Sequence, residues 1–284
     1  MNNTFLEQPR RGKTHEVQLT PHKAKPQCGA HKTQITPYKR SVVWGQLLLF
    51  TAALLLAACG DRNTSVVISG DIHNGGNAKM TLALITADGL EKIDSTNLHD
   101  GHFEFKISSE NELIKERENA PMMFQLFLSD DNSVATMAKK GEKLKITADA
   151  QDMTKTYRIS GGEEAMLIQQ LDSTLTVFIA AADSLYGIYE KNIENDSVRA
   201  DIDAQYMGHV KNHRQYLERF IAEHPNNMAS YIAFYQSYNR RSFFDVYQDL
   251  DVLKQINTNM SKVYPESEYV KTMTHIAEMM ESRQ

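Results

Sequence analysis

A change in hydrophobic spacing near residue 160 constrains the fold more than any other feature of the chain. Before this point, short segments alternate apolar and polar residues and are separated by turn residues, among them Asn-Gly-Gly at 74–76 and Asp-Gly at 100–101. After it, apolar residues recur every three or four positions. Period-two alternation is typical of strands and the longer period of amphipathic helices. The sequence therefore predicts an α+β protein, with an N-terminal antiparallel β-sandwich over residues 66–160 and an all-α helical region over residues 161–284.

Seven or eight strands are expected in the first part. The segment at residues 102–107 places Phe103, Phe105 and Ile107 on one face, and residues 122–128 form a more continuously apolar strand. Short strands separated by turn signals at roughly ten-residue spacing are typical of an antiparallel sandwich.

Two long helices are expected at the start of the second part. Ser160 and Glu163 fit a capping box, in which the serine hydroxyl accepts from a free backbone amide at the start of a helix. A break at residues 195–197 separates this helix from the next, which ends before Pro225. The pair is expected to form an antiparallel hairpin, followed by helices at residues 227–238, 242–256 and 265–280.

An apolar run at residues 42–58 ends at Cys59 and is preceded by Lys39 and Arg40. This is the layout of a secretory signal. The box Leu56-Ala57-Ala58-Cys59 resembles the lipoprotein signal, which implies cleavage before Cys59 and diacylglycerol on its sulfur. An uncleaved membrane anchor is the alternative, because about 17 apolar residues lie at the short end of what spans a bilayer.

The run divides the N-terminal part into an extension with signal peptide (residues 1–58) and a tether (residues 59–65). The membrane is then a partner of the chain through lipidated Cys59. The expected location is the cell envelope of a Gram-negative-type bacterium, at the outer membrane and facing the periplasm.

Charge and cysteine count exclude several classes of function. Residues 1–58 hold eight Lys and Arg against two Asp and Glu, so their removal changes the net charge from −5 to −11. An acidic body gives no electrostatic reason to bind nucleic acid. The chain has two cysteines, Cys28 and Cys59, and lipidation would consume the second, so thiol-disulfide chemistry is excluded for the processed chain.

No catalytic, metal or cofactor site is expected. His209 and His213 lie four residues apart on a predicted helix, a spacing that can bind zinc, but Val210 stands where a zinc protease carries its glutamate. A hydrogen-bonded histidine packed between helices is the favoured interpretation of His213. The histidines at 99 and 102 flank Asp-Gly, which indicates a hairpin turn.

Residues 231–247 contain seven aromatic side chains around a basic pair. Tyr and Arg are typical of binding hot spots, so Tyr235, Tyr238, Arg240 and Arg241 form a possible interaction surface for a protein partner. Helical spacing of the aromatic residues favours core packing over this interpretation.

The order of several short motifs resembles a β-rich domain of unknown function that stands N-terminal to thioredoxin-like thiol-disulfide oxidoreductases in lipoproteins. The motifs are Ile68-Ser69-Gly70-Asp71-Ile72, Asp100-Gly101-His102-Phe103, Lys140-Gly141-Glu142 and Tyr157-Arg158-Ile159-Ser160-Gly161. The family's Trp-Cys-x-x-Cys is absent from this sequence, so its redox activity is not carried over.

The expected function is that of a non-enzymatic, membrane-anchored lipoprotein that acts as a periplasmic or outer-membrane interaction or accessory module. One alternative is the N-terminal half of a truncated or split thioredoxin-like oxidoreductase. A carbohydrate-binding sandwich is the other.

Overall fold

The computed structural model of the chain describes residues 65–86, 88–117 and 120–283. The predicted signal peptide, the lipidation of Cys59 and nearly all of the tether therefore lie outside the described residues.

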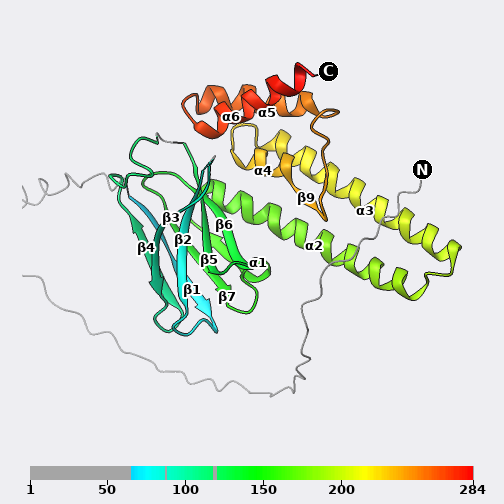
Figure 1. Ribbon diagram of the computed structural model, residues 1–284, viewed down its shortest axis with the longest axis horizontal. Coiled ribbons are helices and arrows are strands. Elements are labelled where there is room, and N and C mark those ends of the chain that lie inside the picture. The colour runs from blue at the N-terminus through cyan, green and yellow to red at the C-terminus, as the bar shows by residue number, and fades with distance from the viewer. Residues whose placement is uncertain (1–64, 87, 118–119, 284) are drawn as a thin grey trace, which may run out of the picture. The chain divides into compact units, whose positions relative to one another are not determined.

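The first part of the chain is a β-sandwich of two four-stranded sheets, as the sequence predicts (Figure 1). One sheet has the order β4-β1-β7-β8 and the other the order β3-β2-β5-β6. The inward faces of both sheets enclose a single apolar cluster that includes Ile68, Leu82 and Phe124. The strands are β1 (Val66–His73), β2 (Lys79–Thr86), β3 (Gly89–Asn97), β4 (His102–Ile107), β5 (Met122–Ser129), β6 (Asn132–Ala138), β7 (Lys143–Asp149) and β8 (Arg158–Ser160).

The pairing of β1 with β7 is parallel, whereas the other pairs in these two sheets are antiparallel. The two strands approach closely at Gly70, where a Cβ atom would lie 1.7 Å from the carbonyl oxygen of Ile146. Glycine is thus required there by the packing of the backbones. The predicted turn before β4 is also present, because Asp100 and Gly101 adopt φ values of 51° and 87° and His99 pairs with His102.

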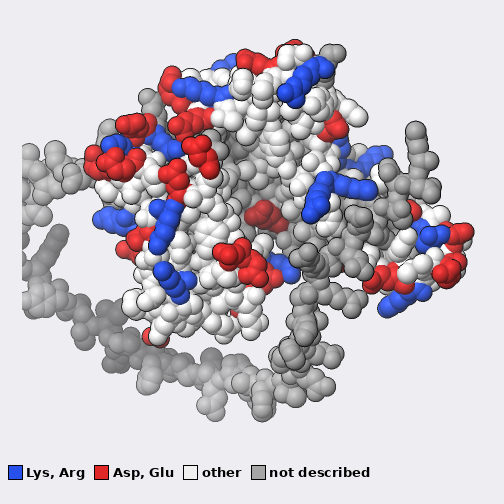
Figure 2. All heavy atoms as spheres, viewed as in Figure 1, with Lys and Arg blue, Asp and Glu red and all other residues white. Residues whose placement is uncertain are grey.

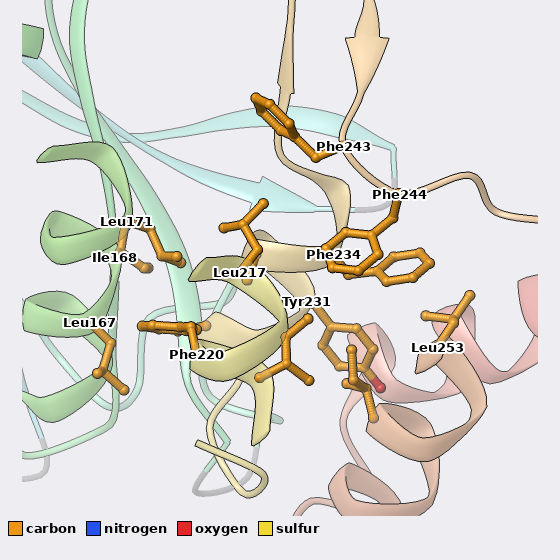
Figure 3. Close-up of a cluster of buried hydrophobic side chains, with 14 of the residues drawn as sticks. Leu167, Ile168, Leu171, Leu217, Phe220, Tyr231, Phe234, Phe243, Phe244 and Leu253 are labelled. Atoms are coloured by element: carbon orange, nitrogen blue, oxygen red, sulfur yellow. The ribbon is translucent and has the colours of Figure 1, made fainter. Parts of the chain in front are cut away.

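The second part is helical, so the predicted α+β class is confirmed. Helix α2 (Glu163–Lys191) and helix α3 (Asp196–Glu223) run side by side as the expected hairpin (Figure 1). Their facing side chains join those of the shorter helices in a second apolar cluster, in which Leu171, Leu217 and Phe234 are fully buried (Figure 3). The shorter helices of this part are α4 (Ala229–Tyr235), α5 (Leu250–Val263) and α6 (Glu268–Glu281). Helix α1 (Met153–Thr156) lies between β7 and β8, and its Met153 belongs to the sandwich cluster.

The predicted capping box at Ser160 is wrong. Ser160 ends strand β8 and pairs with Lys145, so its backbone belongs to the sheet. Gly161 and Gly162 then turn the chain with φ values of 81° and 79°, and Gly162 precedes α2 without a side-chain cap. The glycines allow the chain to pass from sheet to helix in two residues.

The predicted helix at residues 242–256 is wrong in its first half, and the helix predicted at 227–238 ends earlier. Helix α4 stops at Tyr235 and is followed by a two-stranded hairpin of β9 (Ser237–Tyr238) and β10 (Arg241–Ser242). Helix α5 starts only at Leu250. The backbone of residues 236–243 therefore satisfies its hydrogen bonds across the hairpin instead of along a helix.

A buried carboxylate joins the start of α2 to the start of α4. The side chain of Glu164 accepts hydrogen bonds from the backbone amides of Met228 at 2.9 Å and Ala229 at 3.0 Å. These amides belong to the start of α4, where backbone donors have no partner within the helix. Burial raises the pKa of Glu164, and the amides and the charge of Lys139 oppose that shift. Glu164 thus acts as the cap that α4 does not supply from its own sequence.

Replacing this cap tests its contribution to stability. Glu164→Ala leaves two buried amides without an acceptor, so we expect the free energy of unfolding to fall by about 3 kcal/mol. Glu163→Ala removes the exposed neighbouring carboxylate and is expected to cost about 0.5 kcal/mol through the helix dipole alone. Urea denaturation of both variants measures the difference, and equal losses would contradict the capping role.

Candidate interaction site

The β9–β10 hairpin carries three of the four residues predicted to form an interaction surface. Its two turn residues, Asn239 and Arg240, have φ values of 47° and 62°, and left-handed backbone at both central positions is typical of a type I′ turn. Asparagine adopts this conformation readily, whereas arginine does so rarely. The side chains of Arg240 and Arg241 are exposed at this turn.

The base of the hairpin is fixed to helix α2 by aromatic packing. Tyr238 places its ring edge-on to Phe178 at 5.5 Å and donates a hydrogen bond from its hydroxyl to Asp183 Oδ1 at 3.0 Å. Burial and this carboxylate raise the pKa of Tyr238 to about 12. Phe243, directly after β10, contacts the same Phe178 ring at 5.1 Å. Both sides of the hairpin are therefore held by an aromatic side chain on one helix.

A buried histidine on α3 completes the attachment. His213 Nε2 lies 2.6 Å from Gln236 Oε1, and the Gln236 amide nitrogen donates to the carbonyl oxygen of Leu171 at 3.4 Å. Because that nitrogen faces a carbonyl, the Gln236 oxygen faces His213, which therefore donates from Nε2. Burial lowers the pKa of His213. The predicted role of His213, a hydrogen-bonded histidine packed between helices, is confirmed.

The segment after the hairpin is held by Arg214. Its guanidinium binds both carboxylate oxygens of Asp249, at 3.0 and 2.6 Å, and donates to the carbonyl oxygen of Phe243 at 3.0 Å. It also lies 4.8 Å from the centre of the Phe244 ring. Bidentate guanidinium–carboxylate pairs are geometrically specific. Residues 243–249 are thus fixed in the place where the sequence predicted a helix.

The residues of the segment 231–247 divide into two environments. Tyr231 and Phe234 are buried, in agreement with the core interpretation, and Figure 3 shows their rings among the labelled apolar side chains. Tyr235 lies on α4 and is 36% exposed. Arg241 lies close enough to Tyr206 on α3 for its charge to oppose the rise in the pKa of that tyrosine caused by burial.

A cleft of about 680 Å³ lies where the end of the sheet formed by β2, β3 and β5 meets the start of α6. Arg117 and Lys271 are the basic side chains of its lining, and both pair with glutamates, Glu268 and Glu266 respectively. Figure 2 shows acidic side chains gathered over this end of the molecule. No sequence pattern predicts this cleft. Its acidic lining consists of Asp88, Glu91, Glu112, Glu116, Glu266 and Glu268.

The histidines considered as metal ligands lie in different environments. His209 is exposed, whereas His213 points into the aromatic cluster. His102 instead pairs with Asp71 on the neighbouring strand. Within residues 65–86, 88–117 and 120–283, no three His, Cys, Asp or Glu side chains are grouped so that they could hold a metal ion.

Comparison with known proteins identifies the sandwich. Residues 66–167 match the family model of a domain of unknown function, DUF4369. The match spans β1 to β8 and the first residues of α2, and it agrees with the β-rich domain of unknown function that the sequence motifs resemble. No curated protein matches the chain. The chain thus contains a DUF4369 domain followed by a helical region that carries the hairpin.

His213 makes the attachment of the hairpin dependent on pH. Because its pKa is lowered in the folded state, neutral His213 contributes stability that is present above its unfolded pKa of about 6.5 and is lost as the pH falls below that value. We expect the wild-type protein to lose stability between about pH 7.5 and pH 5, by up to about 1.4 kcal/mol per pH unit within the affected range. His213→Gln, which does not titrate, is the control, and parallel losses in the two proteins would contradict the assignment. Guanidinium denaturation at both pH values provides the measurement.

Proposed function

We propose that the protein is a non-enzymatic lipoprotein of the bacterial cell envelope that binds a protein partner through the β9–β10 hairpin. The observation that carries this proposal is the contrast within the hairpin itself. Its base is fixed by Tyr238 and Phe243 on α2, whereas its turn presents Arg240 on left-handed backbone beside the exposed Arg241. Unfavourable backbone conformations are retained mainly where the surrounding structure holds them and function uses them.

The chemistry of the turn suggests the kind of partner. Two guanidinium groups on a hairpin whose base is fixed fit carboxylates, which they can bind through paired hydrogen bonds. The chain from Cys59 onward carries a net charge of −11, so an acidic partner is repelled by the body of the protein as a whole. Recognition must then be local, and an acidic loop or peptide that reaches the hairpin is the favoured partner.

Membrane attachment through Cys59 would place the hairpin's partner in the envelope. Val66, the first residue of β1, follows Cys59 closely in the chain, and the fully extended segment between them reaches at most about 25 Å. Two or more acyl chains give stable attachment to a bilayer, unlike a single one. The sandwich would therefore remain close to the membrane surface, where partners in the same membrane are concentrated.

Lipidation is tested on the full chain produced in a Gram-negative host. Cys59→Ser removes the sulfur that would carry diacylglycerol, so we expect loss of radiolabelled palmitate incorporation and an unprocessed precursor of higher mass. Cys28→Ser is the matched control and should be labelled and processed like the parent. Processing of the Cys59→Ser chain to the mature size would contradict the lipoprotein proposal.

The hairpin is tested by charge reversal. We expect Arg240→Glu combined with Arg241→Glu to abolish co-purification of a partner that the wild-type protein retains from detergent-solubilised envelopes, because like charges then face the acidic segment. Arg219→Glu changes an exposed arginine on α3 and should retain the partner. Thermal unfolding of each variant shows whether the fold is intact. Retention of the same partner by the double variant would reject the hairpin as the binding surface.

A thiol-disulfide oxidoreductase is one partner that this experiment can identify. The match to DUF4369 supports it, since the sequence motifs resemble the domain that accompanies such enzymes. The second support is that residues 60–284 contain no cysteine, so any redox chemistry in the complex would come from the partner. A gene directly downstream that encodes Trp-Cys-x-x-Cys would instead favour the split-gene alternative.

A further inference from the structure

The outward side of helix α2 is an exposed face that carries no charged residue between Met166 and Ile188. Met166, Val177 and Ile188 are 48%, 71% and 45% exposed, although another side of the same helix is buried against α3 and α4. The polar residues of the face are uncharged. The face consists of Met166, Gln170, Ser173, Thr174, Val177, Ala180, Ala181, Ser184 and Ile188.

The two charged residues of this stretch of α2 point elsewhere. Asp172 and Asp183 lie about 120° or more around the helix axis from Val177, the centre of the face. Asp172 accepts a hydrogen bond from Tyr157 at 2.6 Å, and Asp183 accepts one from Tyr238 at 3.0 Å. Both carboxylates therefore serve contacts within the fold and leave the face uncharged.

The three large apolar residues of the face are spaced by 11 positions. Eleven residues make three turns of an α-helix with a remainder of about 20°, so Met166, Val177 and Ile188 lie nearly in line along α2. Small side chains such as Ser173 and Ala180 stand between them, which permits a second helix to approach closely. By contrast, the exposed positions of α3 include charged residues, among them Asp201, Asp203 and Lys211.

The face is complementary to itself when it is reversed about Val177. In an antiparallel pair with a two-fold axis at this residue, Met166 meets Ile188 of the other copy and Gln170 meets Ser184. The Gln170 amide and the Ser184 hydroxyl can each donate a hydrogen bond to the other, so the polar groups gain partners, and symmetry makes each contact twice. The remaining contacts join Ser173 to Ala181 and Thr174 to Ala180.

We propose that α2 forms a two-fold symmetric dimer with a second copy of this chain, antiparallel and centred on Val177. A lipid surface is the alternative contact for this face, because by length and composition α2 is also apolar enough to cross a membrane. Helices that lie on membranes carry Lys and Arg along their polar flank. From Met166 to Ile188 α2 contains no Lys or Arg, which favours a protein surface. The proposal does not depend on the function assigned to the hairpin.

Disulfide cross-linking in isolated envelopes tests the pairing and its direction. Cysteines are introduced into the full chain that carries Cys28→Ser, and the Cys28→Ser chain without an added cysteine is the blank. Linked peptides are identified by mass spectrometry. We expect Val177→Cys to give a 177–177 link, and Met207→Cys, which is 58% exposed on α3, to give none. Met166→Cys with Ile188→Cys should give a 166–188 link. Links of 166–166 or 188–188, or no 177–177 link above the blank, would overturn the proposal.

Charge at the axis supplies an independent readout. Val177→Asp opposes two carboxylates in the dimer, and we expect about 100-fold weaker dimerisation by analytical ultracentrifugation of the detergent-solubilised chain. Met207→Asp is the matched control and should dimerise like the parent, and both variants should keep the parental helix content by circular dichroism. A monomeric parent would reject the dimer. Labelling of Val177→Cys in envelopes by a lipid-soluble but not by a water-soluble maleimide, without a 177–177 link, would reject it too and assign the face to the membrane.

Discussion

The hydrogen bonds from the start of α4 to Glu164 join the helix that leaves the sandwich to the shorter helices that follow α3. Glu164 lies two residues after the glycine turn that ends β8, so its position is set by the sheet. Its carboxylate binds amides 64 and 65 residues later in the chain. Burial raises the pKa of this carboxyl, which means that the amides and Lys139 do not fully replace the hydration it loses. A buried carboxyl in this position is tolerated because it satisfies donors that would otherwise have no partner.

Further contacts extend this connection to the hairpin. Tyr157, just before β8, donates to Asp172 on α2 at 2.6 Å and thereby fixes the direction in which the helix leaves the sandwich. Further along α2, the Phe178 ring contacts both sides of the hairpin, and Asp183 accepts a hydrogen bond from one of them. Because Glu164 also sets α4, which leads directly into Gln236, the hairpin is positioned from both of its ends. The base of the hairpin is therefore fixed to α2 and α3, although it is remote from both helices in sequence.

The sequence predicts those parts of the fold that depend on local patterns. Alternation identifies the strands and three-to-four spacing identifies α2 and α3, because each element buries one face along its own length. The parallel pairing of β1 with β7 and the cap at Glu164 join residues more than 60 positions apart, and no local pattern encodes them. Within the candidate site, Tyr238, Arg240 and Arg241 could be predicted as surface candidates because Tyr and Arg are typical of binding hot spots. The hairpin that groups them could not be predicted, because the spacing of the aromatic residues also fits a helix. The acidic cleft could not be predicted because its lining comes from three segments that are distant in sequence.

Helix α2 has an unusual composition for one helix of a hairpin. A helix that packs on one side needs only one apolar stripe, and its other side is ordinarily charged. In α2 the stripe through Leu171 and Phe178 is buried, yet the exposed face centred on Val177 carries no charge either. Met166, Val177 and Ile188 leave apolar area exposed on this face, and a contact that buried it would be favourable. Among the described residues no further element covers that face, and a second copy of the chain offers a surface that matches it residue for residue.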